Sequence, residues 1–299
     1  MKRILLLGAN GQVGQALTAE PLPQGWELAA YGRAECDIAQ PKSTHKAILD
    51  FKPDLIINAA AMTNVDQCER EREKAEAINF RAPANLAAQC SVHDIPLIHL
   101  STDYVFDGRD GAVPYTTEVP MNPLSVYADT KMMGEMAVRQ ELAWSVILRV
   151  SSVFSEFGTN VLARTLSMLA KNDEVKIVSD QTSCPTYAPD IAKALITIVT
   201  QILRGKHDGF GIFHYCGEPA VTRLEFVEAI MDAYAPFTTK RPRILPALSS
   251  DFPGFAERPA YSVLDCTKIL NSYGISQKPW RDGLKTAVTT LHQQGKLAA

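Results

Sequence analysis

The chain begins with the stretch RILLLGANGQVG, residues 3–14, and this stretch decides the fold. Residues 3–7 form an apolar run, which is typical of a buried strand. Three glycines follow with the spacing GxxGxxG, at Gly8, Gly11 and Gly14. Such glycines permit a sharp turn, let a phosphate approach the backbone and let a helix pack closely on its strand. A glycine triplet alone is a weak signal, but directly after an N-terminal strand it predicts a nucleotide-binding unit whose helix faces a pyrophosphate.

Strands and helices alternate after this unit. Strand-like apolar segments lie at 26–31, 53–58, 95–100 and 144–150, and helical patterns at 41–51, 69–93 and around residue 127 separate them. This alternation predicts an α/β protein with a Rossmann-type, doubly wound parallel sheet. We expect residues 1–150 to form an NAD(P)-binding domain and residues 151–299 to form mostly a smaller, mixed α/β substrate-binding part. A strongly apolar helix at 189–203 is expected to pack back on the first domain.

The second part is less regular. Helices are expected at 159–171, 222–234, 267–273 and 280–294, and strands at 174–178 and 210–216, with a polar loop at 180–186 and a proline-rich passage at 242–259. Thr222 is expected to cap its helix.

Composition and charge exclude several classes of protein. The chain is 46% hydrophobic and 21% charged, which is ordinary for a soluble globular protein. A net charge of -3 offers no basic footprint for nucleic acid. No apolar run reaches the ~18 residues of a membrane span, and the N-terminal run is too short for a signal peptide. The six cysteines are dispersed without a CxxC pair, so we expect no zinc site and a reducing, cytoplasmic location.

The end of the second strand bears on the choice of cofactor. An acidic residue usually stands there in folds that select NAD, where it binds the ribose 2′-hydroxyl. Here Gly32 and Arg33 follow the strand instead. A guanidinium can hold a 2′-phosphate, so we predict NADPH, with use of NADH as well left open. A solvated surface arginine is the alternative.

The reactive groups lie in residues 100–135, which begin LSTDYVFDG and end PLSVYADTKMMGE. Thr102 falls at the carboxyl end of a predicted strand, where open α/β sheets bind their ligands. Tyr127 and Lys131 share one face of a helix. We expect the lysine to lower the pKa of the phenol, so that Tyr127 can give a proton to a carbonyl oxygen that the Thr102 hydroxyl also binds. A Tyr-x-x-x-Lys pair alone is common on helix surfaces. Here the glycine turn, the strand-end Thr102 and the Tyr/Lys pair follow one another in the order expected of a carbonyl reductase, which favours that function.

These motifs resemble those of the extended short-chain dehydrogenases/reductases. More narrowly, STDYVFDG, NPLSVYADTKMMGE and DQTSCPTYAPDIA resemble the dTDP-4-dehydrorhamnose reductases, along nearly the whole chain. The resemblance implies reduction of the 4-keto group of a dTDP-linked 6-deoxyhexulose by NADPH or NADH, the last step of dTDP-L-rhamnose synthesis. It implies Tyr127 as proton donor, Lys131 as its partner, and Thr102 and Asp103 near the sugar.

The expected site residues fall into three groups. The catalytic residues are Tyr127, Lys131 and Thr102. The cofactor-binding residues are Gly8, Asn10, Gly11, Gln12, Val13, Gly14, Arg33, Asp37, Ile38, Ala59, Ala60, Ala61, Thr63, Leu100, Tyr127 and Lys131. The substrate-binding residues are Thr102, Asp103, Ser152 and Arg258.

The chain departs from the family pattern at several positions. Ser152 stands where the family's substrate loop usually has a tryptophan, and Ser183 stands where a glycine is usual. Both changes leave the particular sugar open. Ala16 replaces a glutamate that helps some relatives to pair their subunits through magnesium, so we expect no metal; a homodimer remains open. Arg258 is expected to bind a substrate phosphate or, alternatively, to form a structural ion pair.

The sequence leaves two other functions open. One is another sugar-nucleotide ketoreductase, an epimerase or a dehydratase of the same superfamily. Dehydratases typically follow Thr-Asp with a glutamate, and here Tyr104 occupies that place, which disfavours dehydration. The other is a non-catalytic regulatory or binding protein, because the regulatory subunit of methionine adenosyltransferase belongs to the same family and a fold does not fix a function.

Overall fold

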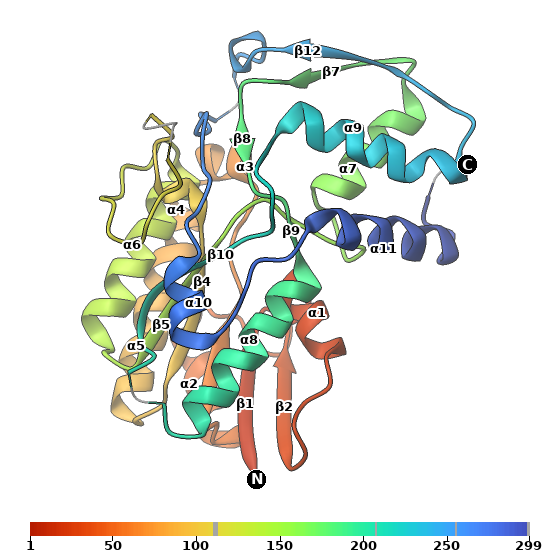
Figure 1. Ribbon diagram of the computed structural model, residues 1–299. Coiled ribbons are helices and arrows are strands. Elements are labelled where there is room, and N and C mark those ends of the chain that lie inside the picture. The colour runs from red at the N-terminus through yellow and green to blue at the C-terminus, as the bar shows by residue number, and fades with distance from the viewer. Residues whose placement is uncertain (110–112, 207, 255, 298–299) are drawn as a thin grey trace.

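A single parallel sheet forms the centre of the molecule in the computed structural model, which describes residues 1–109, 113–206, 208–254 and 256–297. Its strands are β1 (Lys2–Leu7), β2 (Trp26–Tyr31), β3 (Leu55–Asn58), β4 (Leu97–Thr102), β5 (Ser145–Val150) and β10 (Gly211–Tyr215). Their order is β10-β5-β4-β3-β1-β2, and every neighbouring pair is parallel (Figure 1). The chain runs outward in opposite directions from β1 and β3, which confirms the predicted doubly wound, Rossmann-type α/β class.

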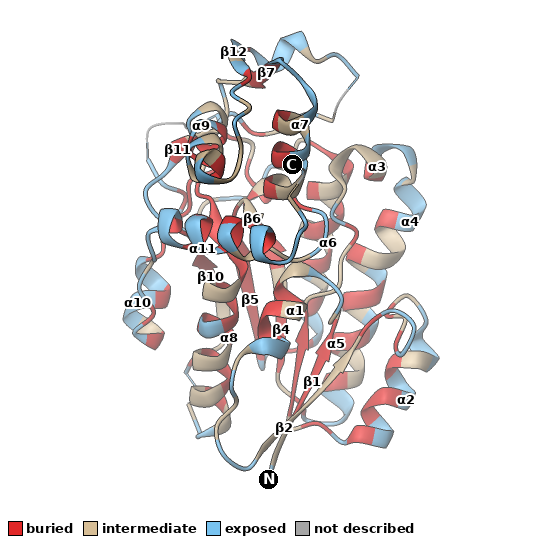
Figure 2. Ribbon diagram, turned by 90° about the vertical axis from the view of Figure 1, so that its right-hand side faces the viewer, coloured by how far each residue is buried: buried red, intermediate tan, exposed pale blue. Residues whose placement is uncertain are grey.

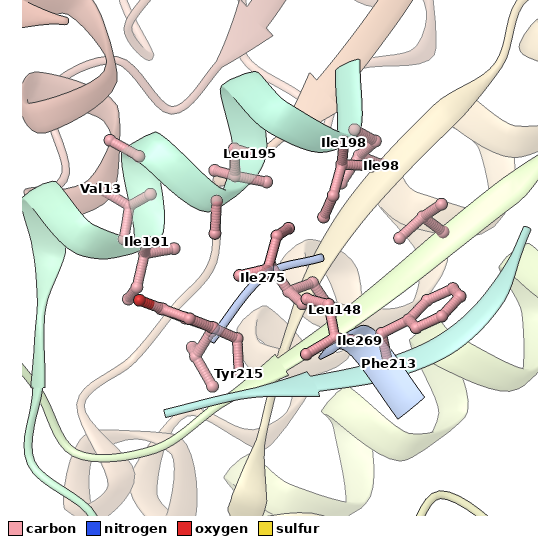
Figure 3. Packing of buried hydrophobic residues seen from close by; sticks show 14 of the residues in the cluster. Val13, Ile98, Leu148, Ile191, Leu195, Ile198, Phe213, Tyr215, Ile269 and Ile275 are labelled. Atoms are coloured by element: carbon pink, nitrogen blue, oxygen red, sulfur yellow. The ribbon is translucent and has the colours of Figure 1, made fainter. Parts of the chain in front are cut away.

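Two sets of helices cover the sheet: α1 (Gln12–Ala19) and α8 (Ala188–Leu203) on one face, and α2 (Pro41–Phe51), α5 (Ala82–Val92) and α6 (Val126–Glu141) on the other. The division follows from the alternation of side chains along each strand. Ile4 and Leu6 of β1 pack with the first set, and Leu5 and Leu7 pack with the second. Figure 3 shows side chains of α8 pointing onto the strands, and Figure 2 shows β1, β4 and β5 buried. The helix predicted at 189–203 therefore packs on the nucleotide-binding sheet.

The segment between β3 and β4 differs from the single helix predicted at 69–93. It consists of α3 (Val65–Arg70), α4 (Arg72–Glu76), a π-helical turn (Ala77–Arg81) and α5. Pro83 explains the π turn, because it has no N–H to offer the Asn79 carbonyl, and Ala82 donates instead to Ala77. The turn sends the Asn79 side chain into the core, where its amide bonds both backbone groups of Met62, at 2.8 and 3.0 Å.

The second part lies over the carboxyl ends of the sheet strands (Figure 1). Its helices are α7 (Val161–Lys171), α9 (Arg223–Tyr234) and α11 (Trp280–Gln293). Its strand pairs are β6 (Val153–Phe154) with β9 (Thr186–Tyr187), β7 (Glu174–Val178) with β12 (Arg243–Ala247), and β8 (Thr182–Ser183) with β11 (Val221–Thr222). The helix α10 (Thr267–Tyr273) packs instead on the sheet, in the same core as α8. Single 3₁₀ turns occur at Asp103–Val105, Ala235–Phe237 and Ser249–Asp251. Thr222 caps α9 as predicted, in a capping box with Glu225. The predicted polar loop at 180–186 contains β8 and the start of β9, because its backbone pairs with neighbouring segments.

The two parts share one strand. β10 comes from the second half of the chain, yet it forms the edge of the main sheet beside β5. The main sheet therefore includes residues beyond 150. A domain boundary at residue 150 stays a prediction about where the substrate-binding part begins. Among the described residues, no helix combines the length and the apolar character that crossing a membrane requires.

Candidate active site

A cavity of about 330 Å³ opens at the carboxyl ends of β1, β2 and β3. Nine of the residues expected to bind a cofactor line it: Gly8, Asn10, Gly11, Arg33, Asp37, Ile38, Ala59, Ala60 and Ala61. It is also lined by six residues outside the expected cofactor-binding set, of which only Met62 was implied by the family resemblance: Gly32, Cys36, Met62, Gln67, Lys74 and Ile78. Gly32, Cys36 and Met62 follow strand ends, whereas Gln67, Lys74 and Ile78 come from the helical segment after β3, and none of them forms a motif.

Three expected residues of the glycine turn lie outside this lining. Val13 is buried in the core under the sheet. The Gln12 side chain accepts a hydrogen bond from the Ser155 hydroxyl at 2.9 Å, which ties the turn to the second part. Gly14 serves packing, because a Cβ there would lie 2.2 Å from the Gly8 carbonyl oxygen. Thr63 is exposed and does not line the cavity either.

The turn at Gly8 fits a bound dinucleotide. Gly8 has φ +88°, and a Cβ on it would lie 2.5 Å from the Ala60 nitrogen. Only a glycine therefore allows the turn to close against β3 and leave the cavity open above it. The first turn of α1 has no acidic residue to compete with a phosphate for its free N–H groups. The residues present fit a nicotinamide dinucleotide.

An acidic side chain does reach the end of β2, contrary to the expectation from sequence. The carboxylate of Glu35 folds back and accepts a hydrogen bond from the Gly32 N–H at 2.9 Å. Arg33 is exposed, and its Nε lies 3.5 Å from Asp37. A carboxylate and a guanidinium thus both stand at the place that distinguishes NAD from NADP.

Replacement of Arg33 tests its role there. We expect Arg33→Ala to raise the KM for NADPH about tenfold, or ~1.4 kcal/mol, because the 2′-phosphate loses its cationic partner. The KM for NADH, which lacks this phosphate, should change little. Arg204→Ala, at an exposed position at the end of α8, is the control. Equal effects on both cofactors would make Arg33 an ordinary surface charge.

The predicted catalytic residues lie together, and neither they nor Leu100 line the cavity; Tyr127 packs against a cluster that includes Met62, which does line it. Ser125 caps α6 by accepting a hydrogen bond from the Ala128 N–H at 3.3 Å, and this places Tyr127 in the first turn. Thr102, at the end of β4, lies close enough to the Tyr127 phenol to act on its pKa, in the lowering direction. Lys131, one turn further along α6, is buried and donates to the Leu100 carbonyl oxygen at 2.6 Å. The structure therefore brings Thr102, Tyr127 and Lys131 into one site.

The protonation of this pair differs from the simple expectation. Burial raises the pKa of Tyr127 well above its usual range, and the nearby Asp103 and Tyr104 act in the same direction, whereas Thr102 lowers it. Burial lowers the pKa of Lys131 to about 8, although Glu135 opposes the shift. In the protein without a bound cofactor, Lys131 thus does not lower the pKa of the Tyr127 phenol. A phenol that keeps its proton suits a proton donor.

Asp103 is bound by the protein itself. Its buried carboxylate accepts hydrogen bonds from Ser262 at 2.5 Å, Ser151 at 2.7 Å and Thr102 at 3.2 Å. These hydroxyls come from the ends of β4 and β5 and from the segment after β12, so Asp103 joins three parts of the chain. Burial raises the pKa of Asp103 to about 6, against these hydrogen bonds.

This shift predicts a pH dependence of stability. The unfolded value is 3.8, so the protonated carboxyl stabilises the fold fully below pH 3.8, and this contribution is lost as the pH rises through about 6. Asp103→Asn has no proton to lose. We expect the free energy of unfolding of the wild type, measured against that of the variant by urea titration, to fall by up to about 3 kcal/mol between pH 4 and 7. Parallel pH curves for the two proteins would contradict this assignment.

The two departures from the family pattern contact one another. Ser152 and Ser183 share a hydrogen bond between their hydroxyl oxygens at 2.7 Å. Ser152 also has φ +42°, in the left-handed region that a side chain rarely adopts. Its carbonyl accepts from the Thr186 N–H, which holds this conformation.

Arg258 forms the ion pair that was one of its two expected roles. Its Nη2 lies 2.9 Å from Asp66 of α3, and its Nη1 donates to the Ala256 carbonyl. Asp66 also accepts from the Ala256 N–H. This contact connects the segment after β12 to α3, whose Gln67 lines the cavity.

Sequence reasoning missed two buried polar chains that support the site. Glu135 of α6 binds Arg149 of β5 through three contacts of 2.7 to 3.1 Å, and Arg149 lies 3.3 Å from His214 of β10. Asn58 of β3 contacts His99 of β4, which contacts Lys131. A charged or polar residue inside an apolar strand run was the available signal in each case.

A dinucleotide cavity, a helix carrying Tyr127 and Lys131, and a strand-end Thr102 define a short-chain dehydrogenase/reductase, an NAD(P)-dependent oxidoreductase. The family model described as RmlD substrate binding domain matches residues 1–293, and the chain belongs to the dTDP-4-dehydrorhamnose reductase family.

Individual relatives resemble the chain over nearly its full length. A dTDP-4-dehydrorhamnose reductase of Aggregatibacter actinomycetemcomitans is 39% identical over 289 residues, which cover 95% of this chain and 98% of that protein. The crystal structure of a dTDP-4-dehydrorhamnose reductase from Clostridium acetobutylicum has a TM-score of 0.89, with 29% identity and coverage of 97% of this chain and 99% of that one. A dTDP-4-dehydrorhamnose reductase from Bacillus anthracis in complex with NADP has a TM-score of 0.86, with 28% identity and coverage of 97% and 100%.

Proposed function

We propose that the protein reduces the 4-keto group of dTDP-4-dehydro-β-L-rhamnose to give dTDP-L-rhamnose, with NADPH as the preferred cofactor and NADH as a second one. The observation that carries this proposal is the grouping of Thr102, at the end of β4, with Tyr127 and Lys131, which lie one turn apart on α6. Full-length membership of the dTDP-4-dehydrorhamnose reductase family supports the choice of sugar nucleotide.

The cavity residues have separate parts in this proposal. The glycine turn and the N-terminus of α1 would hold the diphosphate of the cofactor, and Arg33 its 2′-phosphate. Asp37 and Ile38 would flank the adenine, and the small side chains of 59–61 would let the cofactor lie against the backbone. Bound NADPH supplies the hydride.

The protein supplies the proton. The Tyr127 hydroxyl holds it and delivers it to the keto oxygen of the sugar, since the raised pKa keeps this phenol protonated at neutral pH. The Thr102 hydroxyl lies near the phenol and can donate to the same keto oxygen. Lys131 lies one helical turn away and is held by the carbonyl of Leu100, so its position is fixed by β4.

The sugar end of the substrate is assigned to the second part. Ser152 and Ser183 offer hydroxyls where the family usually has a tryptophan and a glycine, and we propose that they contact the sugar. Asp103 acts on the sugar indirectly, because its carboxylate is occupied by three hydroxyls of the protein. A substrate phosphate would share the Arg258 guanidinium with Asp66.

One assay tests the proposal. Purified protein with NADPH and dTDP-4-dehydrorhamnose made in situ should oxidise one NADPH for each dTDP-rhamnose formed, followed by absorbance and by analysis of the product sugar. A changed sugar without net NADPH oxidation would indicate an epimerase. No oxidation with this or any other 4-keto sugar nucleotide would indicate a binding protein.

Location and assembly complete the proposal. Six buried cysteines are present as free thiols, which supports a reducing compartment such as the cytoplasm. A homodimer is proposed from the family resemblance, and light scattering of the purified protein would measure the mass in solution.

A further inference from the structure

Three extended segments run side by side around β8 in the second part of the molecule. On one side β11 pairs with β8. On the other side the Thr182 N–H donates to the Ala260 carbonyl at 2.8 Å, and the Ser262 N–H donates to the Thr182 carbonyl at 2.9 Å. Arg223 comes directly after β11, and Arg258 stands two residues before Ala260. This pairing brings two arginines that are distant in the sequence to the two sides of one short strand.

The two guanidinium groups differ in their partners. Arg258 is paired with Asp66, at 2.9 Å. Arg223 is partly buried, and in the part of the chain that the structure describes its side chain makes no hydrogen bond and no ion pair. Its backbone is fixed, because the Arg223 N–H donates to the Gln181 carbonyl at 2.8 Å. Arg223 is therefore held at its position while its charge has no counter-charge among the described residues.

Other positive charges lie near Arg223. Burial lowers the pKa of Arg223, and the charges of Arg258 and Arg164 lower it further, whereas the Tyr104 phenol opposes the shift. Arg164 belongs to α7 and is exposed. A cation kept partly out of water among like charges is destabilising, and a bound anion relieves this. The cluster is therefore suited to a ligand with more than one negative charge.

Tyr104 connects the two arginines to the catalytic tyrosine. Its ring packs edge-on against Tyr127, with ring centroids 6.2 Å apart. Burial raises the pKa of Tyr104, and the charges of Arg258 and Arg223 both lower it, so both guanidinium groups act at the same phenol. In a sugar nucleotide the diphosphate is attached at carbon 1, across the sugar ring from carbon 4. A sugar with its 4-keto group at Tyr127 thus carries its diphosphate into the neighbourhood of these arginines.

We propose that Arg223 is a substrate-binding residue that holds, together with Arg258, the diphosphate of a nucleoside-diphosphate sugar. The proposal rests on the proposed function for the class of substrate, and it adds a residue that was not among the expected site residues. A guanidinium presents a planar fork of donors that matches two phosphate oxygens. Arg258 is held by Asp66, whereas the Arg223 side chain has no internal hydrogen bond to break when it turns to the ligand.

Stability without ligand is the first test, and it needs neither substrate nor turnover. Arg223→Gln removes a charge that has no partner to lose, so its Tm should be equal to that of the wild type or higher. Arg258→Gln leaves the Asp66 carboxylate without its guanidinium, and its Tm should be lower. A Tm of Arg223→Gln that falls as far as that of Arg258→Gln would make Arg223 a structural residue and overturn the proposal.

Binding of dTDP is the second test. Calorimetry is done with saturating NADP⁺, so that the dinucleotide cavity is filled and dTDP reports on the substrate side. We expect Arg223→Gln to raise the Kd for dTDP about ten- to hundredfold, the range of a hydrogen bond to a charged group, with Arg223→Lys between this variant and the wild type. Arg281→Gln is the matched control, because it removes one positive charge from an exposed position on α11. Its Kd should equal that of the wild type.

The variants also separate this inference from the proposed reaction. The Kd for NADPH should be the same in the wild type and in Arg223→Gln. Loss of dTDP affinity in Arg223→Gln supports the diphosphate site even if the wild type reduces no ketone. The same loss with UDP or GDP, in a protein that ignores dTDP, keeps the site and rejects only the thymidine nucleotide. An Arg223→Gln variant that binds dTDP as the wild type does, or a wild type that binds no nucleoside diphosphate, would refute the assignment.

Discussion

Tyr127→Phe is expected to lower kcat for ketone reduction by about 10³-fold, within the range of 10²–10⁴ that general acid catalysis contributes. The variant loses only the hydroxyl group that carries the proton. The aromatic ring still packs edge-on against Tyr104, with ring centroids 6.2 Å apart, so the helix should keep its position. The cofactor should therefore bind as it does in the wild type.

The comparison needs turnover and binding to be measured on the same preparation. Steady-state NADPH oxidation gives kcat, and quenching of intrinsic fluorescence by NADPH gives the dissociation constant. Tyr273→Phe is the control, because Tyr273 is a buried tyrosine of α10 whose hydroxyl bonds the Gly209 carbonyl, away from the cavity. Turnover that survived in Tyr127→Phe would show that another group donates the proton.

Glu135→Gln is expected to destabilise the fold by about 3–5 kcal/mol, the usual cost when one partner of a buried ion pair is removed. Glu135 and Arg149 are each 1% exposed, and the guanidinium would remain buried without its carboxylate. The pair connects α6, which carries Tyr127 and Lys131, to β5 and, through His214, to β10. The loss should therefore appear as a lower free energy of unfolding in urea.

Two further variants distinguish the cost of leaving Arg149 buried without its partner from the net contribution of the ion pair to stability. Glu135→Leu combined with Arg149→Met should destabilise less than the sum of the two single changes, since no charge is left buried. Glu174→Gln breaks the exposed pair between β7 and β12 and should leave the unfolding midpoint unchanged. A Glu135→Gln variant as stable as Glu174→Gln would show that water reaches Arg149.

The periodic parts of the fold were predictable from sequence because each depends on local pattern. The helices at 41–51 and 267–273 and the strands at 26–31 and 174–178 match the structure residue for residue. The helix predicted at 69–93 failed because its course depends on Pro83, which frees the Asn79 carbonyl, and on Gly134 of α6, which admits that carbonyl. A Cβ on Gly134 would lie 2.2 Å from the Asn79 oxygen, and only the tertiary structure shows this contact.

The site residues, too, were predictable only where local spacing places them. Tyr127 and Lys131 were identified because helical spacing alone puts them on one face. Asn58 and His99 are 41 residues apart, and only the pairing of β3 with β4 makes them neighbours. Glu35 was missed because its side chain returns to Gly32 through a turn that carries no motif. Contacts set by register or by a side-chain rotamer have no periodic signal in the chain.

Transfer of deuterium from NADPH labelled on C4 of its nicotinamide is the most direct measurement of the central claim, that the chain reduces a ketone with a proton from Tyr127. With one or other of the two stereospecifically labelled cofactors, the proposed reaction places a single deuterium on carbon 4 of the product dTDP-rhamnose, and the Tyr127→Phe variant forms that product at about a thousandth of the wild-type rate. A product without deuterium at carbon 4, whichever labelled cofactor is used, would contradict the account.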